Sequence, residues 1–216
     1  LHFDAIVGKS KISVNGKLLA EHFGGYLPVV VDVTDALEFG KENLIAVWAD
    51  NSNDPNYPPG KQQEVLDFTY FGGIYRDCWL IAHNQVFITD PNYENEEAGG
   101  GLFIAYNNVS DHSAEVLLKI QIRNSGKKAF KGVVEYELQQ PDGQQVASLN
   151  SVIRIKPGKS TYSSDKLTVK SPMLWSPENP ALYNLIVRIR DEKGNPIDGY
   201  RRRIGIRSIE FKGEDG

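Results

Sequence analysis

The stretch EVLLKIQIR at residues 115–123 alternates apolar and polar side chains with a period of two residues, and only Leu117 interrupts the pattern. The same alternation recurs in VEYEL at 134–138 and in YNLIVRIR at 183–190. It is typical of a β-strand that turns one face to a core and the other to water. No window shows a sustained helical period, and we expect at most one helical turn, near residues 34–37. The sequence therefore predicts an all-β protein.

Turn signals separate the apolar runs at intervals of about one strand length. Asn15-Gly16 lies between two short apolar runs, which is the pattern of a tight hairpin whose central residues both have positive φ. Asp142-Gly143, Pro157-Gly158 and residues 193–195 carry similar turn chemistry. Short strands joined by frequent turns indicate β-sandwiches rather than a parallel sheet.

A domain boundary is predicted in the segment DPNYENEEAGGG at residues 90–101, which combines a proline, four acidic residues and three consecutive glycines. We assign residues 1–88 to a first β-domain with about five strands. Residues 89–212 carry about seven strands, a number that suits an immunoglobulin-like β-sandwich. We expect Glu94, Glu96 and Glu97 to form a solvated hinge between the domains.

Composition excludes several classes of function. The chain has 216 residues, 24 Lys+Arg against 28 Asp+Glu and a net charge of −4, so it offers no basic field for nucleic acid. No apolar run reaches the roughly 20 residues of a membrane span. The single cysteine, Cys78, cannot form an internal disulfide, and we expect it to be an unreactive core residue beside Trp79. We expect no metal site, because the four histidines are isolated in the sequence, and no cofactor.

One long irregular stretch, from Asp50 to Phe71, is unusual in a compact domain, where loops of this length are functional or disordered. Its aromatic residues argue against disorder, and it ends in Gly72-Gly73, which would let a backbone approach another group closely. Its Asx-rich beginning, residues 50–54, faintly suggests a calcium loop, but Pro55 stands where the turn would need glycine. We therefore favour ordinary Asx turns.

Five segments together resemble glycoside hydrolase family 2. VNGKLLAEHFGGYLPVVVDVTDAL (14–37), NLIAVWADN (43–51) and FGGIYRDCWL (71–80) are similar to the sugar-binding jelly-roll domain at the front of that family. LWSPENPALYNLIVRIRD (174–191) and RRRIGIRSIEF (201–211) resemble the end of its immunoglobulin-like domain. The resemblance covers nearly the whole chain and implies that residues 1–88 are the C-terminal part of the jelly roll.

The resemblance also implies an activity, the retaining hydrolysis of O-glycosidic bonds. In the family, two catalytic glutamates lie in a (β/α)8 barrel that follows the immunoglobulin-like domain, so we expect the chain to be an inactive internal part of a longer enzyme. The β-galactosidase branch is favoured because Asp67 precedes Ile74 by seven residues, as in galactosidase loops that reach the active site. β-Glucuronidase and β-mannosidase are the alternatives within the family.

Asp67 is accordingly the residue that we expect to bind substrate, and capping of a local turn is its structural alternative. Tyr57, Phe68 and Tyr70 are weaker candidates, which would stack on a sugar ring or pack against the barrel. No catalytic residue can be nominated, because no pair of carboxylates stands out for the two-carboxylate mechanism.

A stand-alone carbohydrate-binding or adhesion module is the alternative from another class of function. The expected partner is a carbohydrate substrate, which binds through the full-length enzyme. We expect neither nucleic acid nor a membrane as a partner. The sequence leaves the oligomeric state open; a jelly roll without its first strands would expose sheet edges, which allows a homo-oligomer. The sequence leaves the compartment open, and a periplasmic or secreted bacterial location is the one that we favour.

Overall fold

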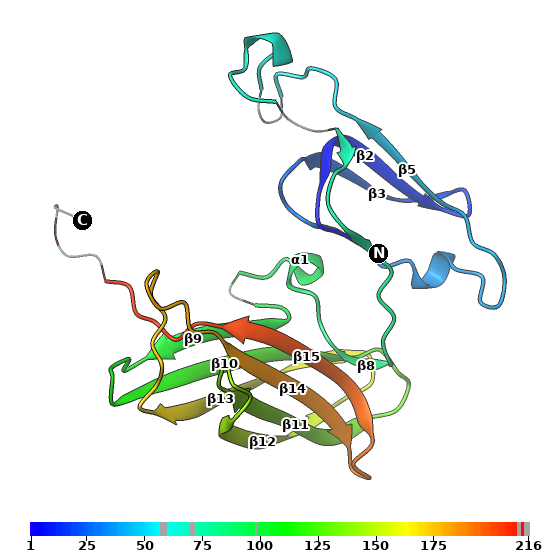
Figure 1. Ribbon diagram of the computed structural model, residues 1–216. Helices are drawn as coiled ribbons and strands as arrows, with labels where there is room; N and C mark the ends of the chain where they lie inside the picture. Colours follow the sequence, from blue (N-terminus) through cyan, green and yellow to red (C-terminus); the bar gives the residue numbers. More distant parts are fainter. Residues whose placement is uncertain (57–59, 70–71, 98, 211–212, 214–216) are drawn as a thin grey trace. The chain divides into compact units, whose positions relative to one another are not determined.

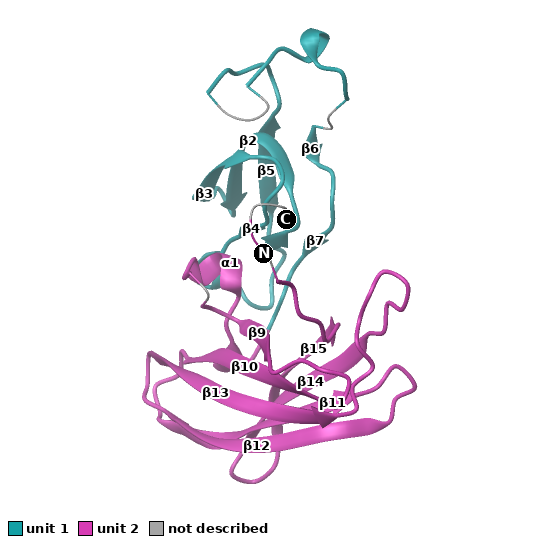
Figure 2. Cartoon of the chain, turned by 90° about the vertical axis from the view of Figure 1, so that its left-hand side faces the viewer, with its two compact units in different colours: residues 1–82 teal, residues 83–216 magenta. Residues whose placement is uncertain are grey.

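The computed structural model describes residues 1–56, 60–69, 72–97, 99–210 and 213. Strands make up most of its regular structure, which confirms the all-β prediction. The chain divides into two compact units, residues 1–82 and 83–216 (Figure 2). The sequence placed the boundary after residue 88, but β8 (Val86–Ile88) pairs with β10 (Ser113–Asn124) and so belongs to the second unit. No helix of the described residues is long and apolar enough to span a membrane.

Unit 1 consists of two small antiparallel sheets and two 3-10 turns. Its elements are β1 (His2–Phe3), β2 (Ile6–Val14), β3 (Lys17–Gly24), β4 (Val29–Val30), η1 (Thr34–Ala36), β5 (Ile45–Asp50), η2 (Gln63–Val65), β6 (Gly73–Ile74) and β7 (Cys78–Trp79). One sheet has the order β4-β1-β7; in the other, β2 lies between β3 and β5 and also pairs with β6. Buried residues such as Phe3, Ile12 and Val29 form a core to which both sheets contribute.

The hairpin predicted at Asn15-Gly16 is confirmed. Val14 pairs with Lys17, so only Asn15 and Gly16 form the turn, with φ of 51° and 80°. These are the positive angles that such a two-residue turn requires. The Asn15 side chain also donates to Ala36 O at 2.9 Å and accepts from Leu44 N at 2.9 Å. This single asparagine therefore both shapes the turn and holds two later segments against it.

Unit 2 is an immunoglobulin-like β-sandwich whose two sheets face each other (Figure 1). Besides β8 and β10 it contains α1 (Pro91–Glu94), β9 (Leu102–Asn107), β11 (Phe130–Gln139), β12 (Gln145–Ile155), β13 (Lys159–Lys170), β14 (Tyr183–Asp191) and β15 (Pro196–Ile204). One sheet has the order β13-β10-β8, with β9 also on β10; the other has the order β12-β11-β14-β15. The described strands after residue 90 thus match the predicted count of about seven.

The core of unit 2 consists of the residues that the alternating pattern selects. The apolar positions that follow the alternation in β10, β11 and β14 are at most 2% exposed: Val116, Leu118, Ile120, Ile122, Val134, Tyr136, Leu138, Tyr183, Leu185, Val187 and Ile189. Complete burial of one such side chain contributes roughly 1.5–3 kcal/mol. Their polar neighbours on the opposite face form cross-strand ion pairs, such as Arg188 Nη1 with Glu137 Oε2 at 2.7 Å.

The hinge predicted at residues 90–101 is wrong, because this segment is attached to the β-sandwich of unit 2. Asp90 caps α1 by accepting hydrogen bonds from Asn92 N and Tyr93 N. The Glu94 side chain is only 8% exposed and accepts from Arg123 Nη2 at 2.7 Å. A nearly buried carboxylate of this kind needs its cation, since burial without a partner is costly.

Glu96 forms the second attachment of this segment. Its carboxylate accepts hydrogen bonds from the Tyr162 hydroxyl and from Gln121 Nε2. These bonds lower the pKa of Glu96, and the hydrogen bond to Glu96 raises the pKa of Tyr162. Lys119 lies over the Tyr162 ring, with Nζ 4.5 Å from its centroid. Two of the three acidic residues expected to form a solvated hinge therefore attach this segment to the β-sandwich, although Glu96 stays exposed to solvent.

Candidate functional site

The long loop expected to carry the substrate contact is held at both ends by one strand. Residues 51–72 connect β5 to β6, and both of these strands pair with β2. Asp50 at the end of β5 pairs with Lys9, and Gly73 at the start of β6 pairs with Val7. The loop thus leaves and rejoins the sheet at nearly the same point of β2.

Two glycines lie where the ends of the loop meet the sheet, and the backbone requires glycine at the first of them, Gly8. Gly8 has φ of +95°, and a Cβ at this position would lie 2.0 Å from Asp50 O. A Cβ on Gly72 would lie 2.4 Å from Asn51 Nδ2. Any larger residue at position 8 would therefore displace the end of β5, and one at position 72 would displace Asn51.

The first residues of the loop form Asx turns, as the sequence predicts. Asp50 Oδ1 accepts from Ser52 N at 2.9 Å, and Asp54 Oδ1 accepts from Asn56 N at 2.9 Å. Lys9 Nζ on β2 lies 2.5 Å from Asp54 Oδ2. The hydrogen bond from Lys9, together with that from Asn56 N, lowers the pKa of Asp54 to about 2. The described residues include no group of three or more His, Cys, Asp or Glu that could hold a metal ion.

Asp67 follows the 3-10 turn η2 in the second half of the loop. Its side chain is exposed and makes no hydrogen bond or ion pair with any residue that the structure describes. The alternative role as a turn cap is therefore not observed among these residues. A bound molecule could therefore donate a hydrogen bond to this carboxylate without displacing any of the described residues. One presented carboxylate can orient a hydroxyl group, but the two-carboxylate mechanism of retaining hydrolysis needs a second about 5 Å away.

The aromatic candidates can be followed only in part. Phe68, next to Asp67, is 51% exposed, so one side of its ring is available for contact. Tyr57 and Tyr70 lie outside the described residues. The described part of the loop thus presents the Asp67 carboxylate and the Phe68 ring at consecutive positions of the sequence.

Comparisons with known proteins identify the chain's family. The family model described as glycosyl hydrolases family 2 matches residues 101–207. A beta-galactosidase of Thermoanaerobacter pseudethanolicus is 31% identical over 217 residues, which cover 100% of this chain and 26% of that protein. The chain belongs to glycosyl hydrolases family 2.

Relatives of this family 2 chain carry two kinds of activity in their names. A beta-glucuronidase of Formosa agariphila is 28% identical over 100% of this chain and 22% of its own length. The solved structure of Bacteroides uniformis beta-glucuronidase has a TM-score of 0.85 and 30% identity, with 98% of this chain and 24% of that one covered. The chain thus spans about a quarter of the length of these relatives.

The prediction that Cys78 lies in the core of this family 2 chain is wrong. The apolar run around it suggested a core position, but Cys78 is exposed and Trp79 beside it is 54% exposed. These two residues form only the two-residue strand β7, which pairs with β1 at the edge of a sheet. Partial burial raises the pKa of the Cys78 thiol.

Two further residues that support the loop were not predicted, Gly8 and Lys9. Both lie in IVGKSKISV at residues 6–14, which forms β2, and apolar and polar residues alternate only in its last three positions. The glycine at a strand position was the available signal, because a glycine inside a strand often marks a close approach of two backbones.

Proposed function

We propose that the chain is the non-catalytic front portion of a longer retaining glycoside hydrolase that acts on β-galactosides. Membership of family 2 and the share of its relatives that the chain covers support this assignment. The single observation that carries the role of the site is the exposed carboxylate of Asp67 on a loop with both ends on β2. The two catalytic carboxyl groups would come from the remainder of the longer protein.

In this proposal Asp67 accepts hydrogen bonds from sugar hydroxyls. A hydrogen bond to a charged acceptor contributes about 1.5–3 kcal/mol. The ion pair of Lys9 with Asp54 and the Asx turns hold the first part of the loop, which limits the conformational entropy lost when the sugar binds. Phe68 would offer its ring to the apolar face of the same sugar.

The charge of Asp67 favours a galactoside over a glucuronide. A glucuronide carries its own carboxylate, and two negative groups close together disfavour binding unless a cation lies between them. Asp67 has no such cation among the described residues. β-Glucuronide hydrolysis nevertheless stays the alternative, because several relatives are named beta-glucuronidases.

The test compares Asp67→Asn with Glu64→Gln in the longer protein. Glu64 is an exposed acidic residue of the same loop, so its variant controls for the loss of one charge. We expect Asp67→Asn to lower kcat/KM for an aryl β-galactoside roughly tenfold to a hundredfold, as the loss of one charged hydrogen bond implies, and Glu64→Gln to leave it unchanged. Equal activity of the two variants would refute the role of Asp67, and faster turnover of the aryl β-glucuronide would refute the galactoside assignment.

The 216-residue chain by itself provides a second test. We expect it to hydrolyse no aryl β-galactoside and to bind no neutral galactoside in calorimetry, because one carboxylate on an exposed loop does not form a closed sugar site. Turnover by this chain would contradict a non-catalytic role. Binding of a neutral galactoside would instead favour a stand-alone carbohydrate-binding module.

A further inference from the structure

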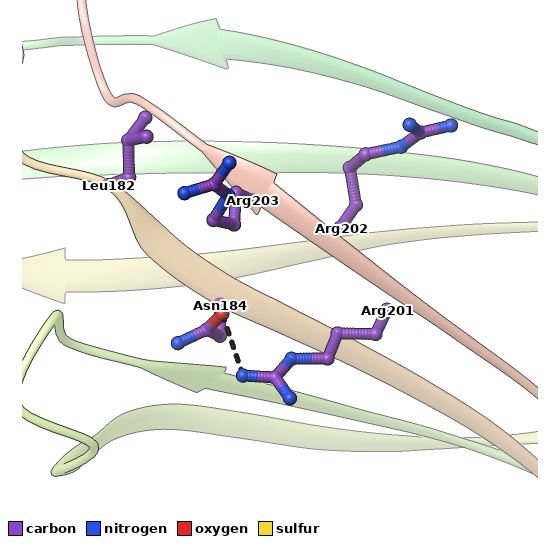
Figure 3. Close-up of a pocket in the computed structure, with 5 residues that line it drawn as sticks. All are labelled: Leu182, Asn184, Arg201, Arg202 and Arg203. Carbon is purple, nitrogen blue, oxygen red and sulfur yellow. Dashed lines mark hydrogen bonds between the residues drawn. The ribbon is translucent and has the colours of Figure 1, made fainter.

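A basic pocket on unit 2 is not explained by the proposed function. Figure 3 shows the five residues that line it, from β15, from β14 and from the position before β14: Leu182, Asn184, Arg201, Arg202 and Arg203. The pocket has a volume of about 620 Å³, which lies in the range of small-molecule sites. β15 is the last strand of its sheet, so the pocket opens at a sheet edge.

Strand register places the polar groups of this pocket together. Asn184 pairs with Arg203 across β14 and β15, and Arg201 lies two residues before Arg203. Because side chains two residues apart in a strand share a face, Asn184, Arg201 and Arg203 project from the same face of the sheet. Arg201 Nη2 donates to Asn184 Oδ1 at 3.1 Å, as the dashed line in Figure 3 marks. Asn184 therefore orients one guanidinium group.

Arg202 is held in a different way, since it alternates to the other face of β15. Its Nη2 donates to the Tyr200 hydroxyl, and its guanidinium carbon lies 5.1 Å from the centroid of the Tyr200 ring. Arg201 and Arg203 are thus the two arginines best placed to act together with Asn184.

The positive charge of the pocket is not neutralised within the described part of the chain. Arg201, Arg202 and Arg203 form no ion pair with a described carboxylate. Two other arginines of the same sheet behave differently: Arg188 pairs with Glu137 at 2.7 Å and Arg190 with Glu135 at 2.8 Å. Three adjacent guanidinium groups without a counter-charge repel one another and attract an anion.

We propose that this pocket binds the carboxylate or sulfate group of an acidic oligosaccharide. Guanidinium groups recognise such planar or multi-oxygen anions with two hydrogen bonds at once. The Asn184 amide nitrogen donates no hydrogen bond to a described residue, so it can bind a sugar hydroxyl beside the anion. Leu182 supplies the apolar part of the lining. That the ligand is a saccharide rests on the proposed function; that it is an anion rests on the arginines.

The experiment measures binding of oligosaccharides to the whole 216-residue chain by calorimetry. The probes are a galacturonate tetrasaccharide, a sulfated galactose tetrasaccharide, a neutral galactose tetrasaccharide and inorganic sulfate. We expect one or both acidic tetrasaccharides to bind, and the comparison of the two shows whether the pocket prefers a carboxylate or a sulfate group. The affinity should fall as the salt concentration rises. Absence of binding by both acidic probes overturns the proposal. Binding of the neutral tetrasaccharide with the same affinity as the acidic ones also overturns it. If inorganic sulfate binds as tightly as the acidic tetrasaccharides, the ligand is not a saccharide.

Matched variants locate the site. Arg201→Ala with Arg203→Ala removes two positive charges from the pocket, and Arg154→Ala with Lys156→Ala removes two exposed positive charges at β12, the opposite edge of the same sheet. We expect the first pair to weaken binding at least tenfold and the second pair to leave it within twofold, with circular dichroism showing that both variants fold. Equal weakening by both pairs would overturn the pocket as the site.

The test of the pocket and the test of the proposed function can fail independently of each other. Hydrolysis of a galactoside by the longer protein depends on Asp67 and needs no binding at Arg201 or Arg203. Hydrolysis without anion binding therefore refutes only the pocket, whereas anion binding without hydrolysis refutes only the proposed enzyme.

Discussion

Lys9 Nζ lies 2.5 Å from Asp54 Oδ2, and this contact joins a strand in the middle of a sheet to the loop that carries Asp67. Asp54 also closes its own Asx turn by accepting from Asn56 N. The lysine thus acts on a turn that already exists, and its removal should loosen the loop without changing the sheet.

The pKa of Asp54 tests this contact directly. Because the hydrogen bonds from Lys9 and from Asn56 N lower the pKa of Asp54 to about 2, the folded form holds the proton less tightly than the unfolded chain does. The ion pair therefore stabilises the protein above about pH 4, and its contribution disappears as pH falls through about 2. We expect Lys9→Met to shift the NMR titration of the Asp54 carboxyl carbon to higher pH. Lys11→Met, which removes the partner of Glu21 on the same strand, should leave that titration unchanged; a shift in the control alone would contradict the assignment.

Substitution of Gly8 should be severe. Alanine at this position combines a positive φ with a Cβ 2.0 Å from Asp50 O, so β2 and β5 must separate. We expect Gly8→Ala to lower the free energy of unfolding by about 3 kcal/mol or more in urea denaturation. Gly16→Ala has the same type of φ but open space around it, and should cost only about 1 kcal/mol. Similar losses for both would show that the close approach at Gly8 contributes nothing.

The attachment of residues 90–101 can be tested through Arg123. Arg123→Met leaves the nearly buried Glu94 carboxylate without its cation, which should cost about 3 kcal/mol of unfolding free energy. Lys131→Met breaks the more exposed pair with Glu192 and should change stability by less than about 0.5 kcal/mol. If both variants had the same small effect, Glu94 would be solvated, as the sequence suggested.

Local sequence pattern predicted the long strands well. The alternating apolar positions of β10, β11 and β14 lie in the core, whereas Leu117, Val133 and Ile186, which break the alternation, do not belong to it. Alternation with a period of two is a property of the strand itself. The two-residue strands β1, β4, β6 and β7 are too short to be bounded in this way. Such short segments have no period of their own, and their pairing partners lie far away in the sequence.

Interactions between distant residues account for the remaining errors. Glu94 and Arg123 are separated by 29 residues and Glu96 and Tyr162 by 66, so nothing near the glutamates indicated that they were paired. Asp67 was selected through the family resemblance. The structure adds that its carboxylate is exposed, and its role in binding stays a prediction.

The two ends of the loop at residues 51–72 have an evolutionary consequence. Since β5 and β6 both pair with β2 and meet it at Lys9 and Val7, the distance between the ends of the loop is set by the sheet and is independent of the loop's length. Lengthening such a loop costs little, because the closure entropy grows only with the logarithm of its length. The segment can therefore change in length and sequence while the strands on either side of it stay paired with β2. A sugar contact at Asp67, as proposed, would then be able to evolve independently of the scaffold.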